Sequence, residues 1–210
     1  MSINHKGGIH PATPEFLNAL REKCDEFGAL LAFDEIQCGL GRTGKLFAYE
    51  NFGVMPDLLT MAKPLANGIP IGAVILSPNV ASQIALGDHG TTFGGSPFAT
   101  KVGHTVFSII SSQDFLNNVI EMGQYLHSEL LKFTFPAIKE IRGIGLMIGI
   151  ELKEGYDTQE FVDHCRLQGL LCISAGSNTI RLVPPLIIAK EHIDEALRVF
   201  RHTFDVLSFI

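Results

Sequence analysis

The sequence predicts an α/β protein that begins with part of a larger sheet and ends in a smaller sheet with helices. Two short apolar runs support this, because each is typical of a buried strand: residues 29–33 end in Asp34 and Glu35, and residues 57–62 end in Lys63. The interval between the two charged ends matches one strand-to-strand crossover unit. Open α/β sheets bind ligands at the carboxyl ends of their strands, so we expect a site where these charged residues meet.

Composition places the chain among globular proteins. Its 210 residues are 46% hydrophobic and 18% charged, which suffices for one domain or two small ones. A net charge of −6 without a basic run argues against a nucleic-acid-binding surface. No apolar stretch approaches the roughly 20 residues of a membrane-spanning helix. Neither nucleic acid nor a membrane is therefore an expected partner.

The opening of the chain and its cysteines carry no targeting or metal-binding signal. Residues 1–16 lack the apolar core of a signal peptide, and without arginine they do not resemble a mitochondrial transit peptide. The four cysteines have no metal-ligand spacing, so no metal site is expected. Reduced thiols in an intracellular protein are the simplest interpretation.

The first elements surround the first strand. A helix is expected from Pro14, capped by Thr13, with apolar residues at helical spacing up to Gly28. After the strand, a glycine-rich loop leads to a short helix at residues 47–52. The loop sequence GLGRTG lacks the ending of a P-loop, which argues against a nucleotide site.

After the second charged strand end, residues 71–76 predict a third buried strand and residues 80–86 a helix. Residues 87–97, GDHGTTFGGSP, are a glycine-rich loop whose backbone N–H groups and threonine hydroxyls can bind a phosphate dianion. A polar turn that only caps the next helix is the alternative. We place the domain boundary here, with residues 1–96 in the first domain and residues 97–210 in the second.

The second domain is predicted to combine helices with a small sheet. Long helices are expected from Ser96 and from Asp114. The glycine-punctuated segment KEIRGIGLMIGIEL is typical of a strand pair or a bent strand. The remaining expected elements are a helix at residues 158–168, strands at 170–173 and 179–183, and an amphipathic helix at 190–207.

Two residues at the predicted strand ends suit pyridoxal phosphate (PLP). Lys63 can form the Schiff base with the aldehyde, and its apolar, turn-forming neighbours would remove solvent from the amine and favour its nucleophilic form. Asp34 can pair with the pyridinium nitrogen and keep it protonated, so that the ring accepts electrons. From local sequence alone, Lys63 also fits an ordinary loop lysine and Asp34 a strand-ending cap.

Five segments, in order, resemble the successive blocks of class III PLP-dependent aminotransferases, most of all those that act on acetylornithine. The segments are FDEIQCGLGRTG, AKPLANGIPIGAV, GDHGTTFGGSP, IRGIGLMIGIEL and IRLVPPL. The resemblance runs from about Gly7 to the final helix and covers the C-terminal half of such proteins. It implies the C-terminal half of a fold type I PLP-dependent transferase: part of the large parallel or mixed-sheet domain with the cofactor lysine, then the small α+β domain.

The resemblance assigns roles to individual residues. Lys63 would be the catalytic lysine, whose amine moves a proton between the substrate α-carbon and the cofactor C4′. Asp34, Gln37 and Thr92 would bind the ring nitrogen, the phenolic oxygen and the phosphate of the other subunit's cofactor, respectively. Arg181 would hold the substrate α-carboxylate as a fork. An ion pair with a helix acid is the alternative for this arginine.

Four further residues also receive predicted roles. Glu35 either supports the loop or contacts cofactor or substrate. Lys6 stands where relatives have a glutamate that pairs with the substrate-binding arginine, a departure that puts the gating of this arginine in question. His89 and His104 are expected to be structural or solvent-facing, since PLP chemistry needs no histidine base.

The implied activity is transfer of an amino group between N-acetylornithine and 2-oxoglutarate, in arginine biosynthesis, by a homodimer. Ornithine or another ω-amino acid is the alternative donor. The phosphate cup and much of the substrate pocket belong to the N-terminal half of such proteins. A non-catalytic remnant, or a partner of a full-length subunit, is therefore a further alternative. By resemblance, the location is the mitochondrial matrix, with the cytosol as the alternative.

Overall fold

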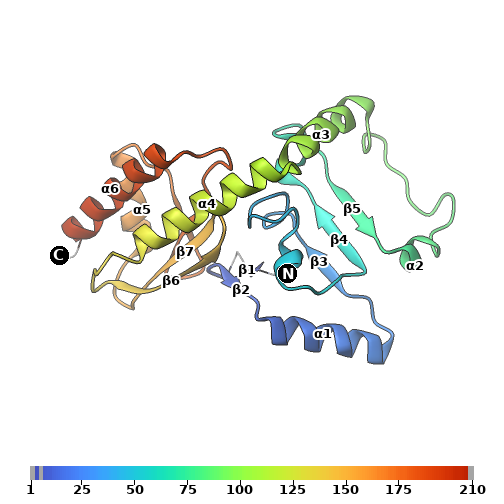
Figure 1. Cartoon of the computed structure of the whole chain (residues 1–210), viewed down its shortest axis with the longest axis horizontal. Coiled ribbons are helices and arrows are strands. Elements are labelled where there is room, and N and C mark those ends of the chain that lie inside the picture. Colours follow the sequence, from blue (N-terminus) through green and yellow to red (C-terminus); the bar gives the residue numbers. More distant parts are fainter. Residues whose placement is uncertain (1–2, 5–6, 208–210) are drawn as a thin grey trace. The chain divides into compact units, whose positions relative to one another are not determined.

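The computed structural model describes residues 3–4 and 7–207, and these form two compact units (Figure 1). The unit that we call the N-terminal unit holds Ala12–Leu116. Among the described residues, the C-terminal unit holds residues 3–4 and 7–11 together with residues 117–207. A short segment near the start of the chain therefore belongs to the later part of the structure.

The compact units divide inside helix α4 (Gln113–Leu130), whereas we expected a boundary between residues 96 and 97. Helix α3 (Pro97–Ile110) does begin there, because the Ser96 hydroxyl accepts the N–H of Ala99 and caps it. α3 nevertheless packs in the core of the N-terminal unit through Ile110. The assignment of residues 97–210 to a separate functional domain stays a prediction.

The N-terminal unit is built on a three-stranded mixed sheet in the order β3–β4–β5. Strands β3 (Ala32–Asp34) and β4 (Leu58–Met61) are parallel, with Asp34 beside Thr60. Their carboxyl ends therefore lie at one edge of the sheet, as the sequence predicted. The first apolar run is buried only in part, since Leu30 is 54% exposed.

Strand β5 (Ala73–Leu76) runs antiparallel to β4 and forms one edge of the sheet. It is not the buried strand that we expected, since Val74 is 57% and Ile75 is 43% exposed. Successive strand residues point to opposite faces, so both faces of the sheet are open at β5. An apolar run therefore predicts that a strand forms. It does not predict whether other elements of this chain pack against either face of that strand.

Helices and short 3-10 turns flank this sheet. Helix α1 (Pro14–Phe27) is capped by the Thr13 hydroxyl, as expected, and ends at Gly28 in a left-handed conformation. Helix α2 (Pro78–Ala81) is a single turn, shorter than predicted, and residues 81–95 are exposed. The two 3-10 turns are η1 (Ala48–Asn51) and η2 (Lys63–Ala66).

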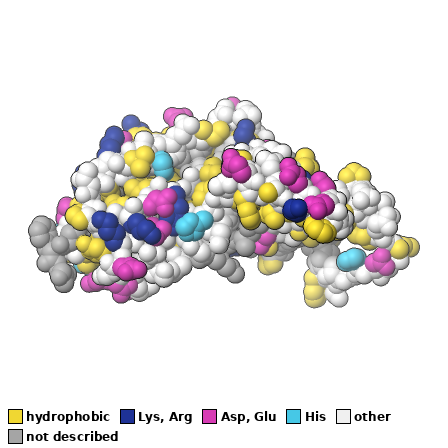
Figure 2. Space-filling view, turned by 90° about the horizontal axis from the view of Figure 1, so that it is seen from below, with side chains coloured by type: hydrophobic (Ala, Val, Ile, Leu, Met, Phe, Trp, Pro, Cys, Tyr) yellow, Lys and Arg dark blue, Asp and Glu magenta, His cyan; other side chains and the backbone are white. Residues whose placement is uncertain are grey.

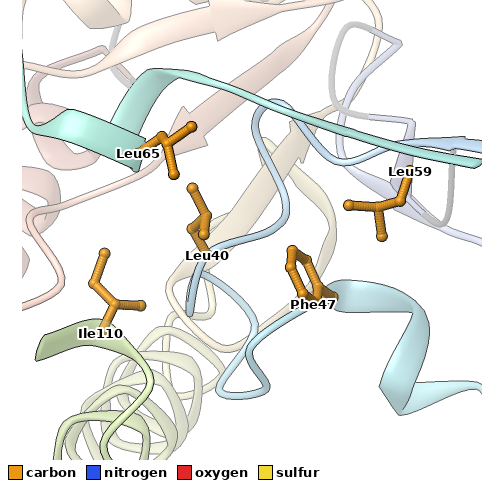
Figure 3. Packing of buried hydrophobic residues seen from close by; sticks show 5 residues of the cluster. All are labelled: Leu40, Phe47, Leu59, Leu65 and Ile110. Atoms are coloured by element: carbon orange, nitrogen blue, oxygen red, sulfur yellow. The ribbon is translucent and has the colours of Figure 1, made fainter. Parts of the chain in front are cut away.

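Two buried clusters hold the N-terminal unit together. One, which we call the turn cluster, joins the loop after β3, strand β4, turn η2 and helix α3 (Figure 3). Its buried members are Leu40, Phe47, Leu59, Leu65 and Ile110. The other joins α1 to β3, and its buried members are Leu17, Leu31, Phe33 and Val54. The turn cluster lies beside the strand ends where the site is expected.

The C-terminal unit combines a four-stranded antiparallel sheet, in the order β6–β7–β9–β8, with helices and a small β1–β2 ladder. Its elements are β1 (Ile3–Asn4), β2 (His10–Pro11), β6 (Ile138–Ile144), β7 (Met147–Leu152), α5 (Thr158–Leu167), β8 (Ile173–Ala175), β9 (Thr179–Leu182) and α6 (Lys190–Leu207). The expected strand pair, α5, β9 and α6 all form. Strand β8 begins at Ile173, the last residue of the strand predicted at 170–173. It begins later than predicted because the backbone N–H of Leu170 still donates to the carbonyl oxygen of Cys165 in α5.

Strand alternation gives the C-terminal sheet two different faces. Ile148 and Ile150 share one face with their partners Leu182 and Ile180. Toward the helices, Phe161 of α5 and Phe204 of α6 have ring centroids 4.5 Å apart. The opposite face carries Gly149, Glu151, Thr179 and Arg181.

No helix in the described part of the chain is both long and apolar enough to span a membrane.

Candidate active site

Asp34 ends β3 at the edge where β4 also ends. Its Oδ1 accepts the backbone N–H of Ile36 at 3.0 Å and the hydroxyl of Thr60 at 3.4 Å. The first bond turns the chain out of the sheet, and the second ties the carboxylate to β4. Both bonds that this half-buried side chain makes within the described residues end at Oδ1. These bonds leave Oδ2 available to a protonated ring nitrogen, which is compatible with the role predicted for Asp34.

Glu35 supports the loop rather than the strand edge. Its side chain is 1% exposed, and its oxygens accept the N–H groups of Ala48 and Tyr49 at 2.6 and 2.8 Å. Burial raises the pKa of this carboxyl, and the two backbone bonds oppose the rise. Gly39 closes the same loop: a Cβ there would lie 2.8 Å from the Glu35 carbonyl oxygen. Half-buried Gln37, the expected ligand of the phenolic oxygen, is carried on this loop.

Lys63 is the first residue of turn η2, and one residue, Ala62, separates it from the end of β4. Its φ is 43°, in the left-handed region that non-glycine residues rarely adopt. Its side chain is exposed, whereas Leu65 and Ala66 of the same turn are buried. We expected the apolar neighbours of Lys63 to remove solvent from its amine. Within this chain they do not, because those neighbours face inward and Lys63 faces outward.

Thr92 lies on the exposed loop between α2 and α3. The hydroxyl of its neighbour Thr91 accepts the N–H of Gly94 at 3.1 Å and so serves the loop itself. The cap of α3 comes from Ser96. Thr91 and not Thr92 therefore closes the loop, and Ser96 and not Thr92 caps α3. This is compatible with the phosphate contact predicted for Thr92. His89 and His104 are exposed, in line with the expectation that they are solvent-facing.

Arg181 lies on β9 in the C-terminal unit, opposite Gly149 of β7 and Ile173 of β8. It is half-buried, and burial lowers the pKa of its guanidinium. It lines a mainly apolar cavity of about 440 Å³, together with Cys172 and Pro184. Helix α6 also lines this cavity, whereas strand alternation places the Arg181 side chain on the sheet face opposite the helices.

Arg142, on β6, organises a buried polar network that the sequence analysis did not foresee. Its Nε donates to the carbonyl oxygens of Gly8 and Ile9 at 3.0 and 3.1 Å, and its Nη2 donates to Gly8 at 2.7 Å and to Thr179 at 3.3 Å. Its Nη1 forms an ion pair with Glu151. Arg142 thereby fixes the segment around Gly8 against the sheet face that also carries Arg181.

The signal for Arg142 was present in the sequence. It is an arginine between the apolar residues Ile141 and Ile144 of β6, and a buried guanidinium requires an anion or carbonyl partners. Its partners are distant in sequence, so no local pattern distinguished it from Arg181. Lys6, where the expected departure from the family falls, lies outside the described residues, and its role stays a prediction.

Charged groups near the surface extend this network. Figure 2 shows basic, acidic and histidine side chains side by side over the C-terminal unit. Lys139 bonds the other oxygen of Glu151 at 2.6 Å, and Glu140 pairs with Arg142 at 2.7 Å. Within residues 3–4 and 7–207, no group of three or more potential metal-ligating side chains comes together.

We expect this network to make the stability of the C-terminal unit depend on pH. Hydrogen bonds from Lys139 and Arg142 lower the pKa of Glu151 to about 2. A carboxylate whose pKa is depressed by folding stabilises above its unfolded pKa, and this contribution is lost as the pH falls toward the folded value. Thermal unfolding between pH 5 and pH 2, roughly the interval spanned by these two values, should therefore show a steeper loss of stability in the unaltered chain than in Glu151→Gln. Equal slopes would contradict this prediction.

Comparison with known proteins places the chain in a family. The model of the class-III aminotransferase family matches residues 2–204. The chain belongs to the class-III aminotransferases.

Within this family, several similar proteins are acetylornithine aminotransferases. The mitochondrial enzyme of Yarrowia lipolytica is 49% identical over 202 residues, which cover 95% of this chain and 48% of the relative. The enzyme of Methanocaldococcus jannaschii is 42% identical over 206 residues, covering 96% of this chain and 51% of the relative. The chain thus spans about half the length of the curated relatives that it matches.

Solved structures of the family have the same fold. N-acetylornithine aminotransferase from Stenotrophomonas maltophilia gives a TM-score of 0.87 at 37% identity, covering 97% of this chain and 54% of that chain. Ornithine aminotransferase from Plasmodium yoelii gives 0.90 at 30% identity, covering 98% and 56%. The predicted fold class, the C-terminal half of a fold type I transferase, is confirmed.

Proposed function

We propose that this chain is the part of a PLP-dependent aminotransferase that carries the cofactor lysine, and that the whole protein transfers an amino group between N-acetylornithine and 2-oxoglutarate. The observation that carries this proposal is the parallel pairing of β3 and β4, with Asp34 beside Thr60. It brings the strand ends that bear Asp34 and Lys63 to the same edge of one sheet. Membership of the class-III aminotransferases supports the reaction class.

When bound, PLP supplies an electron-accepting ring and an aldehyde that reacts with amines. Asp34 would accept the ring N–H and keep that nitrogen protonated, and Gln37 would bond the phenolic oxygen. Lys63 would attach the cofactor and then carry the proton at the substrate α-carbon. Thr92 would reach the phosphate bound by the other subunit. Arg181 would hold the substrate α-carboxylate.

The identity of the amino donor is a separate part of this proposal. Acetylornithine aminotransferases among the relatives support N-acetylornithine, whereas similarity to the Plasmodium yoelii ornithine aminotransferase keeps ornithine as the alternative. The two donors differ in charge, because acetylation replaces an ammonium group by a neutral amide. A direct comparison of the two donors therefore discriminates between them.

Assembly with a second subunit is also part of the proposal. The N-terminal unit exposes large apolar side chains, among them Phe93 at 87% and Leu86 at 107%, and Figure 2 shows hydrophobic side chains on its surface. Apolar patches of this kind favour association. They support a homodimer, or the second candidate function, a partner of a full-length subunit. The names of relatives from Yarrowia lipolytica and Alnus glutinosa, which call them mitochondrial, support a mitochondrial location.

An absorption experiment tests the proposed function. The purified chain is incubated with PLP, and N-acetylornithine or ornithine is then added at equal concentration. We expect the visible band of the bound cofactor to disappear faster with N-acetylornithine and to return with 2-oxoglutarate. A faster response to ornithine would reverse the assignment of the donor. A band that neither donor changes, in a chain shown to be folded by circular dichroism, would contradict transfer by this chain alone and favour the second candidate function, a partner of a full-length subunit.

A further inference from the structure

The backbone of Lys63 is held in an unfavourable conformation. A left-handed φ costs an L-residue about 1–2 kcal/mol, and such a conformation persists only where the surroundings determine it. The exposed side chain of Lys63 cannot supply this constraint. The constraint must come from the rest of turn η2.

The turn is anchored by the residues that follow Lys63. Leu65 is 7% and Ala66 is 0% exposed. Backbone bonds close the turn, from Leu65 to the carbonyl of Ala62 at 3.0 Å and from Asn67 to the carbonyl of Pro64 at 3.2 Å. These local bonds set the turn but do not attach it to the fold. Leu65 makes that attachment.

Leu65 packs in the turn cluster, where Figure 3 shows it next to Leu40. Leu40 is 1% exposed and, like Lys63, has a left-handed φ, of 51°. Leu40 belongs to the loop that carries Gln37, so the two leucines join the loop after β3 to the turn after β4. The two segments assigned to the cofactor thus meet through an apolar contact.

Helix α3 closes the other side of the turn. A Cβ at Gly103 would lie 3.5 Å from the carbonyl oxygen of Leu65 and 3.9 Å from its Cγ. Helix α3 therefore approaches turn η2 closely at Gly103, where an alanine Cβ would be in ordinary van der Waals contact with Leu65.

We propose that Leu65, held between Leu40 and Gly103, is a positioning residue that fixes the direction of the exposed Lys63 amine. This inference rests on the proposed function, in which Lys63 attaches PLP. It assigns Leu65 no contact with cofactor or substrate. Its role is to keep turn η2, and with it the backbone of Lys63, in one conformation.

The test measures where PLP attaches. The chain is incubated with PLP, reduced with borohydride and mapped by mass spectrometry, which gives the labelling rate of Lys63 relative to exposed Lys45 and Lys101. We expect Leu65→Ala to lower this relative rate about 10-fold or more, since small misplacements of a reacting group cost up to about 100-fold. Leu17→Ala removes an equally apolar side chain from the other cluster and should change the ratio less than twofold.

Two further measurements separate positioning from loss of structure. Reductive methylation with formaldehyde should modify Lys63 equally in Leu65→Ala and Leu17→Ala, because the Lys63 side chain is exposed in both variants. Gly103→Leu pushes on the turn without emptying the core and should also lower the PLP ratio, whereas Gly103→Ala should not. If Leu65→Ala fails to fold by circular dichroism, the Gly103 pair carries the test.

The outcomes are distinct. Preference for Lys63 in the unaltered chain, lost in Leu65→Ala or Gly103→Leu and kept in their controls, supports the inference. Preference kept in folded Leu65→Ala and Gly103→Leu overturns the inference and leaves the proposed function intact. Absence of preference in the unaltered chain overturns the proposed function and this inference with it.

Discussion

Replacing Arg142 by methionine is expected to destabilise the C-terminal unit by about 3 kcal/mol, the lower end of the cost of breaking a buried ion pair. The substitution keeps an apolar stem but leaves Glu151, which is 8% exposed, with Lys139 as its remaining cationic partner among the described residues. It also removes the donor to the carbonyl oxygens of Gly8 and Ile9. Chemical denaturation followed by circular dichroism measures the effect, and hydrogen exchange should show loss of protection around Gly8.

Lys139→Ala is the matched control for this prediction. Lys139 is 59% exposed at its side chain and pairs with the same carboxylate. Exposed ion pairs contribute about 0–1 kcal/mol, so this variant should remain close to the unaltered chain in stability. A loss of stability as large in Lys139→Ala as in Arg142→Met would show that burial of the pair does not determine its importance.

Asp34→Asn is expected to weaken PLP binding roughly 10- to 100-fold, which corresponds to the 1.5–3 kcal/mol of a hydrogen bond to a charged group. Asparagine retains an oxygen that can accept the Ile36 N–H, so the turn after β3 should keep its form. It lacks the negative charge that keeps the ring nitrogen protonated. Titration with PLP, followed by absorption, gives the affinity of each chain.

Thr60→Val controls for disturbance of the same strand end. It removes the hydroxyl that donates to Asp34 at 3.4 Å but leaves the carboxylate in place. We expect its affinity for PLP to stay within a few-fold of the unaltered chain, because this long hydrogen bond is weak. Affinities of Asp34→Asn and the unaltered chain that agree within twofold would contradict the role of Asp34.

Much of the fold follows from local signals in the sequence. Thr13 and Pro14 predict the start of α1, and Ser96 predicts the start of α3, because each side chain caps its own helix. The amphipathic pattern at residues 190–207 predicts α6 with its observed bounds. These signals act over a few residues and need no partner from elsewhere in the chain.

Other features depend on contacts that a local pattern does not contain. The apolar run at β5 predicts a strand, yet Val74 and Ile75 are exposed because no other element of this chain covers them. Residues 80–86 have apolar content, but Ile84 and Leu86 find no surface to pack on, and the helix ends at Ala81. Burial is a property of the assembled fold, so strand and helix patterns alone overstate it.

The candidate site shows the same division. The order of strand, acid, crossover and lysine predicted that Asp34 and Lys63 lie at one sheet edge, and the parallel pairing of β3 and β4 agrees with it. The left-handed backbone of Lys63 and the burial of Glu35 were not predictable, since both depend on packing across the loop and turn. Roles in binding cofactor and substrate stay predictions for Asp34, Gln37, Lys63, Thr92 and Arg181.

The central claim is that Lys63 is the attachment point of PLP. Incubation of the unaltered chain with PLP, reduction with borohydride and peptide mapping test it most directly, with Lys63→Arg as the control. We expect a visible absorption band before reduction and an adduct concentrated on Lys63, both lost in the control. Adducts spread evenly over the exposed lysines, in equal amount in both chains, would contradict it.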